Sequence, residues 1–136
     1  MDKGEAWGEI VLRAALLGEA IKFRAQRALW LGLCSEEPNT GGGQDEQELD
    51  YTGYARVRVP RNEATFKFDG PQATLAVDVI FPLCAAGEAF ATHAILGVEQ
   101  SGGGIMLYRL RARLPIEIVP GVRPVVPAGS LTIVEH

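Results

Sequence analysis

Residues 55–69 read ARVRVPRNEATFKFD, and a two-residue alternation runs through most of this stretch. Valines alternate with arginines before Pro60, and phenylalanines then alternate with threonine, lysine and aspartate. Successive side chains of a strand point to opposite faces of a sheet, so this period indicates strands with one buried and one exposed face. The stretch therefore predicts two half-buried strands separated near Pro60, a residue that limits a strand.

Further strands are predicted on both sides of this stretch. The apolar run from Ala28 to Cys34 precedes it, and the alternation resumes from Leu75 to Phe81 after an Asp-Gly-Pro turn. His93 to Val98 and Ile105 to Leu114 flank a glycine-rich connection, which predicts a hairpin. One face of its second arm is expected to carry Met106, Tyr108, Leu110, Ala112 and Leu114.

The carboxy-terminal part is expected to add short pieces of strand. Ile116, Ile118 and the run from Leu131 to Val134 are β-branched or apolar, and four prolines separate these pieces. Seven to nine short strands at this spacing are typical of a sandwich. The sequence therefore predicts an all-β fold, a jelly-roll-like β-sandwich.

The amino-terminal segment has a different period. Trp7, Ile10, Val11, Ala14 and Leu17 recur at steps of three and four residues, and Gly18 follows them as a stop. This pattern predicts a short amphipathic helix. We divide the chain into a helical segment, residues 1–18, and a β-sandwich domain, residues 19–136, and expect the apolar stripe to pack on the sandwich or on a partner.

Composition excludes several classes of protein. The chain has 136 residues, 47% of them hydrophobic and 22% charged, which is typical of one globular domain and not of a disordered chain. A net charge of −4 offers no basic field for nucleic acid. No apolar run approaches the roughly 20 residues that span a bilayer, and the amino end has no secretion-signal pattern. We expect neither nucleic acid nor membrane as a partner.

Residues 35–50 read SEEPNTGGGQDEQELD and contain six acidic side chains and three consecutive glycines. Such a composition buries little apolar surface, so we expect a mobile, exposed loop. A loop of this length often serves a contact, and both a binding role and a merely solvated role are open. Its carboxylates lack the fixed spacing of a calcium loop.

Catalytic chemistry has few candidates in this chain. It contains two histidines, His136 at the end and His93 among small and apolar residues, where a packed or strand-edge role is expected. Cys34 and Cys84 each close an apolar segment, which favours buried free thiols, with a disulfide between them as the alternative. We assign no catalytic residue, no cofactor and no metal ligand.

The unusual charge feature is a row of arginines. Arg109, Arg111 and Arg113 occur at two-residue spacing, which places three like charges side by side on one strand face, and Arg56 and Arg58 form a similar pair. Such a row is either solvated or matched by carboxylates of a partner. The candidate interface residues are these five arginines, together with three apolar residues of the helix: Trp7, Ile10 and Val11.

Five segments in order along the chain resemble a family of small tailed-phage virion proteins, described as tail-fibre-like or head-decoration proteins. They are the strand Leu29–Leu33, the acidic loop leading into Tyr51–Arg56, the strand Ile95–Val98, the segment Gly102–Tyr108 and the closing strand Val126–Ile133. The resemblance covers most of the chain from Leu29 onward. The chain departs from the family pattern in its longer amino-terminal amphipathic segment and in lacking a Trp-Gly pair before Ile95.

The resemblance implies a β-sandwich with a structural role in a virion assembled in the host cytoplasm. Within this group we expect a capsid cement or decoration protein that binds across major capsid subunits, since the chain has no repetitive shaft sequence. The alternatives are a tail, baseplate or tail-fibre component and a carbohydrate- or receptor-binding jelly-roll module. The expected partners are the major capsid protein or other virion subunits, and a homo-oligomer, dimer or trimer, is expected.

Overall fold

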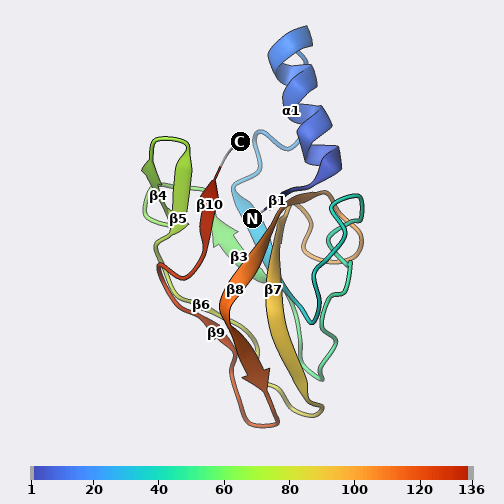
Figure 1. The fold of residues 1–136 in the computed structure, drawn as a ribbon, viewed down its shortest axis with the longest axis vertical. Helices are drawn as coiled ribbons and strands as arrows, with labels where there is room; N and C mark the ends of the chain where they lie inside the picture. The colour runs from blue at the N-terminus through green and yellow to red at the C-terminus, as the bar shows by residue number, and fades with distance from the viewer. Residues whose placement is uncertain (1, 135–136) are drawn as a thin grey trace.

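The computed structural model describes residues 2–134, and the side chains of Asp2 and Leu114 lie outside the description. Most of the regular structure is strand, with one short helix near the amino end (Figure 1). The helix α1 spans Glu5–Leu17. The strands are β1 Asp2–Lys3, β2 Ala28–Cys34, β3 Val57–Pro60, β4 Phe66–Asp69, β5 Gln72–Leu75, β6 Val79–Ile80, β7 Ala89–Gly97, β8 Met106–Ile118, β9 Val125–Val126 and β10 Thr132–Val134.

These strands form three antiparallel groups. The largest sheet has the order β1-β8-β7-β2-β3, a second has the order β10-β5-β4, and β6 pairs with β9. The all-β prediction with a short amino-terminal helix is confirmed, while the jelly-roll topology and the division at residue 18 stay predictions. The hairpin predicted around the glycine-rich connection is formed by β7 and β8.

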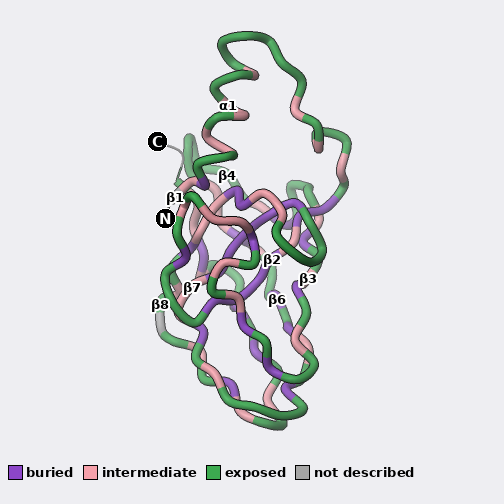
Figure 2. Tube along the Cα trace, turned by 90° about the vertical axis from the view of Figure 1, so that its right-hand side faces the viewer, coloured by how far each residue is buried: buried purple, intermediate pink, exposed green. Residues whose placement is uncertain are grey.

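The main core lies between the five-stranded sheet and the smaller sheets. Leu31 and Leu33 of β2 meet Phe81 and Leu131 there, each at most 4% exposed. Alternate residues of β2 point inward, as strand geometry requires. In Figure 2 buried residues gather in the body of the molecule and are scarce along α1. The body therefore carries its own hydrophobic core.

The predicted face of the second hairpin arm is partly wrong. Met106 pairs with Gly97 across an irregularity in the ladder and lies in a separate buried cluster with Cys34 and Ile95. Tyr108 and Leu110 do pack against the main core. A bulge shifts the alternation by one residue, which sends Met106 to the other face.

Pro115 also departs from the expectation that it would end a strand. It lies inside β8, where the ladder with β7 is interrupted. Between the pairs Ala91–Ile116 and His93–Arg111, β8 advances five residues (116 − 111) while β7 advances two (93 − 91). A proline is tolerated at such a bulge because no ladder hydrogen bond from its nitrogen is needed. This bulge alters the surface of the sheet along β8.

Candidate assembly surfaces

The helix α1 extends away from the body of the molecule (Figure 1). No residue of α1 is buried, although Gly4 before it is anchored by its N–H to the Leu107 carbonyl at 2.9 Å. The helix ends as predicted at Gly18, whose φ of 71° is left-handed and favours glycine. We call α1 and the returning segment 18–27 the arm.

The predicted apolar stripe of α1 is covered only in part. Trp7, Ile10 and Val11 are half-buried, and the ring of Trp7 lies 5.5 Å from that of Phe23 in the returning segment. The indole N–H of Trp7 is buried without a hydrogen-bond acceptor among the described residues. Trp7 therefore packs within the chain, and Ile10 and Val11 are partly covered, so these three residues are less available to a partner than the sequence suggested, whereas Leu17 of the same predicted stripe is 66% exposed.

A second stripe lies on the opposite side of the helix and was missed by sequence analysis. Leu12 is 59% exposed and Leu16 is 77% exposed, and Leu17 next to them is 66% exposed. Glu5 and Glu9 continue the stripe, since positions 5, 9, 12 and 16 follow helical spacing along one face. We call Glu5, Glu9, Leu12 and Leu16 the outer stripe. Two of its four residues are leucines, and this spacing is the signal by which the sequence could have revealed the stripe.

The three arginines Arg109, Arg111 and Arg113 have different surroundings. Arg109 forms an ion pair with Glu37 at 3.0 Å and donates a hydrogen bond to the Pro38 carbonyl. Arg111 and Arg113 are exposed, and within residues 2–134 neither has an ion-pair partner. Arg109 thus holds the acidic loop of its own chain, and Arg111 and Arg113 stay available to a partner.

Arg56 is paired within its own chain and is not exposed to a partner in this structure, contrary to what the pattern predicted. Its side chain is buried, and it donates to both Glu48 carboxylate oxygens at 2.8 and 2.9 Å. It also donates to the carbonyls of Glu99 at 3.0 Å and Gly102 at 2.6 Å. The predicted pairing of Arg56 with Arg58 on one exposed face is wrong, because Arg58 is exposed whereas Arg56 precedes β3 and turns inward.

The same network reaches β2 through Tyr54. The Tyr54 hydroxyl donates to Glu48 at 2.5 Å and accepts the Leu33 N–H at 3.1 Å. Gly32 leaves room for this, since a Cβ there would lie 2.8 Å from a Glu48 oxygen and 3.0 Å from the Tyr54 oxygen. Burial and the hydrogen bond to Glu48 raise the pKa of Tyr54 well above its ordinary value. Tyr54 therefore stays protonated and acts as a structural hydroxyl.

The acidic loop 35–50 is largely exposed, as its composition predicted, but it is anchored to the body at Gln44. Gln44 is 1% exposed, its amide donates to the Glu99 carbonyl at 3.0 Å, and its carbonyl accepts the Glu99 N–H at 2.8 Å. Its own N–H donates to the Gly104 carbonyl at 2.9 Å. A Cβ at Gly97 would lie 2.1 Å from Gln44, so this glycine makes room for it. The Cys34 thiol donates to the Glu46 carbonyl of the loop at 3.6 Å, and Cys34 forms a buried cluster with Ile95 and Met106.

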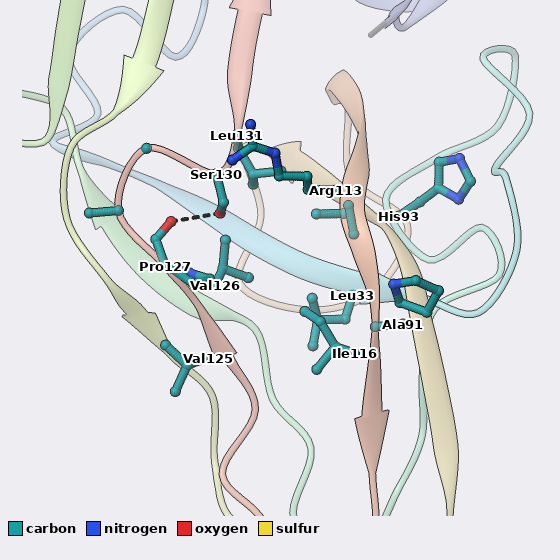
Figure 3. A pocket seen from close by; sticks show the side chains of 15 residues that line it. Leu33, Ala91, His93, Arg113, Ile116, Val125, Val126, Pro127, Ser130 and Leu131 are labelled. Carbon is teal, nitrogen blue, oxygen red and sulfur yellow. Dashed lines mark hydrogen bonds between the residues drawn. The ribbon is translucent and has the colours of Figure 1, made fainter.

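A groove of about 390 Å³ lies between β8 and the segment 125–131 (Figure 3). Its lining is mostly apolar and includes Leu33 and Ala91 from the sheet and Val126 and Leu131 from the opposite wall. Arg113 extends from the bulged part of β8 toward the Leu131 side (Figure 3). Protein grooves that bind partners combine an apolar lining with a few polar groups in this way.

His93 and the two cysteines are the residues considered for chemistry, and Cys34 lies opposite His93 in the ladder between β2 and β7. The ring of His93 points away from the groove (Figure 3), and its pKa lies below the ordinary value, mainly because of burial. Cys34 and Cys84 are buried free thiols, as predicted, and burial raises the pKa of Cys34 to about 12. Within residues 2–134 no three potential metal ligands gather. His136 lies outside the described residues.

Comparison with known proteins gives one family. A family model described as podophage GP4 fiber I protein gp80 matches residues 8–134. No curated protein matches the chain. In the described part of the chain, no helix has the length and apolar character needed to cross a membrane.

Proposed function

The chain belongs to the podophage GP4 fiber I protein gp80 family, and on that premise we propose that it is a fibre subunit joined to other virion subunits through its arm. Family membership makes the chain a virion structural protein. It also supports the tail-fibre alternative of the sequence analysis better than the capsid-cement role that we first expected.

The observation that carries the proposal is the uncovered arm. A helix of 13 residues is marginal in water by itself, and helices are usually stabilised by packing of an apolar face. In α1 the apolar outer residues Leu12 and Leu16 are mostly exposed. Burying a leucine side chain contributes about 1.5–3 kcal/mol, so a subunit that covers both would bind with substantial free energy. The body, by contrast, buries its own core.

We propose further that the protein works by binding and not by catalysis. Cys34 is a poor nucleophile because its thiol is buried and stays protonated well above neutral pH. The paired carboxylate Glu48 is held by Arg56 and Tyr54 and so serves the fold. Arg111, Arg113 and the outer stripe, which are exposed, are groups that suit contacts between subunits.

Fractionation of particles tests the proposed function. Particles are separated into shells and tails with fibres, and the chain is quantified in each fraction by mass spectrometry. We expect it with the tails and fibres. Recovery with the shell alone would support a cement role and overturn the fibre proposal.

A matched pair of variants tests the part played by the arm. Leu12→Gln with Leu16→Gln should reduce incorporation into particles more than tenfold while leaving the fold of the body intact, because neither leucine is buried in the chain. Phe68→Gln is the control, since Phe68 is 72% exposed on β4 in a different part of the molecule. Equal incorporation of both variants would show that the arm is not the attachment element.

A further inference from the structure

We propose that the groove between β8 and segment 125–131 binds the arm of a second copy of this chain, so that copies join head to tail. The inference rests on the proposed function, because it names the partner of the arm. It concerns two features that the chain itself leaves uncovered, the outer stripe and the groove. The arm extends away from the body and from its own groove, so another copy must supply it (Figure 1).

Shape supports this pairing. Leu12 and Leu16 are one helical turn apart on the outer stripe, and helices that dock in apolar grooves use anchors at this spacing. The groove has a volume of about 390 Å³ and a mostly apolar lining, with Val126 and Leu131 on one wall. It therefore offers room and matching chemistry for these two leucine side chains.

Charge supports the same pairing. The outer stripe continues from its leucines into Glu9 and Glu5, and the Glu9 side chain is 68% exposed even though it pairs with Arg13. Arg113 lines the groove, and Arg111 precedes it by two residues on the same strand. Within residues 2–134 neither arginine has an ion-pair partner. A helix seated by its leucines places carboxylates within reach of guanidinium groups that can hold them.

Charge also argues against the simplest alternative, a contact between two parallel arms. Such a contact would set Glu5 and Glu9 of one copy against the same residues of the other. Like charges in contact weaken association, whereas the groove offers arginines. A head-to-tail contact uses two different surfaces and generates a ring when the rotation closes or a filament when it does not.

Sedimentation analysis of the purified full-length chain over a concentration series tests the proposal. We expect the wild-type chain to associate. An arm variant, Leu12→Glu with Leu16→Glu, and two groove variants, Arg113→Glu and Ser130→Trp, should each weaken association at least tenfold. Ser130→Trp fills the groove with a ring, and Lys67→Glu is a control that makes the same change in charge on the exposed face of β4.

Mixing the variants separates a head-to-tail contact from any symmetric one. The arm variant keeps an intact groove, and Arg113→Glu keeps an intact arm. An equimolar mixture of these two chains should therefore form a one-to-one complex with wild-type affinity, although each chain alone associates at least tenfold more weakly than the wild type. Folding of each variant is checked by its melting curve and by the circular dichroism of the body.

Three results would overturn the inference. They are a wild-type chain that stays monomeric, groove variants that associate as the wild type does, and a mixture that fails to form the one-to-one complex. These results leave the particle fractionation unaffected. A chain found with the tail fibres but monomeric in solution would keep the proposed function and remove only the head-to-tail contact.

Discussion

The acidic loop 35–50 is tied more closely to the body, and the helix α1 is less covered, than their compositions suggest. The loop contains six carboxylates and three glycines, yet Gln44 and Leu49 are buried within it and Glu48 is locked to Arg56. The helix carries several leucines, yet none of its residues is buried. The difference shows that burial depends on specific partners and not on composition alone. The loop has such partners in its own chain, whereas Leu12 and Leu16 of the outer stripe stay mostly exposed.

The two regions therefore make different contributions. The loop belongs to the folded body, because its polar groups are satisfied by Arg56, Tyr54 and backbone groups around Glu99. The arm is attached through Gly4 and Trp7 at the base of α1, and its returning segment is bonded to the body, since Gln26 donates to the Val98 carbonyl and Arg61 donates to the Phe23 carbonyl. The outer stripe lies in solvent. Substitutions in the loop network should change stability, whereas substitutions on the outer stripe should change assembly.

The largest expected effect is that of Arg56→Ala. The change leaves the Glu48 carboxylate without its charged partner and removes the links to the carbonyls of Glu99 and Gly102. Breaking a buried ion pair from one side typically costs about 3–5 kcal/mol. We expect a loss of that size in the free energy of unfolding, measured by urea denaturation.

The neighbouring arginine supplies the control for this prediction. Arg58 lies two residues away, on the exposed face of β3, so Arg58→Ala should stay within about 0.5 kcal/mol of the wild type. Equal effects of the two substitutions would mean that the loop is not held by the Arg56 network. The claim that the loop belongs to the folded body would then be wrong.

A smaller effect is expected from glycine substitutions that act in opposite directions in the two regions. Gly97→Ala places a Cβ 2.1 Å from the Gln44 side chain and should expel it, at a cost of about 2 kcal/mol in unfolding free energy. Gly8→Ala in α1 meets nothing closer than 3.8 Å and should stabilise the helix by about 0.8–1 kcal/mol. Urea denaturation measures the loss of stability in Gly97→Ala, and the circular dichroism of the helix measures the gain in Gly8→Ala.

A double variant checks the cause of the Gly97 effect. Once Gln44→Ala has removed the side chain in the way, adding Gly97→Ala should cost little more, because the two substitutions act on one contact. Additive costs would mean that Gly97 acts through the strand backbone and that Gln44 is not the anchor of the loop.

The positions of several strands could be predicted from the sequence by alternation, but the buried face could not be predicted everywhere, since Phe68 on the expected inner face of β4 is 72% exposed. The residues from Ala28 to Cys34 form β2 as expected, and the alternating phenylalanines 66 and 68 lie in β4. The burial of Arg56, which the pattern placed on an exposed face, could not be predicted in this way. Its partner Glu48 lies eight residues back in a loop, and only the fold brings Gly32, Tyr54 and Glu99 around them.

The bulge in β8 was also beyond the reach of pattern analysis. Alternation gives the face of a residue only while the register is continuous, and the ladder between β7 and β8 shifts twice. The first shift, beside Pro115, accompanies the groove, and the second places Met106 on the far face. The candidate site is therefore less predictable than the fold, since it depends on these irregularities.

The pH dependence of stability offers a finer probe of the face under the loop. Burial raises the pKa of Cys34 from an ordinary 9.0 to about 12, so the unfolded chain releases this proton at lower pH than the folded chain. The contribution is fully present below pH 9 and is lost as pH rises from 9 toward 12. Cys34→Ala should flatten the fall in unfolding free energy over this range.

The slope, and not the absolute stability, is the quantity to compare, because the smaller alanine leaves a cavity that lowers stability at every pH. A variant with the same slope as the wild type would indicate that the loop leaves Cys34 open to solvent. Native-state alkylation at pH 8 gives a parallel measurement, in which the wild-type thiol should react far more slowly than in the unfolded chain.

Hydrogen exchange followed by mass spectrometry, on the free monomer and on assembled particles, tests the central claim most directly. We predict that amides between residues 33 and 56 are protected in both states, whereas amides of α1 exchange quickly in the monomer and at least tenfold more slowly in the particle. An arm that is already protected in the monomer, or that gains no protection in the particle, would contradict the claim that α1 is the element that assembly covers.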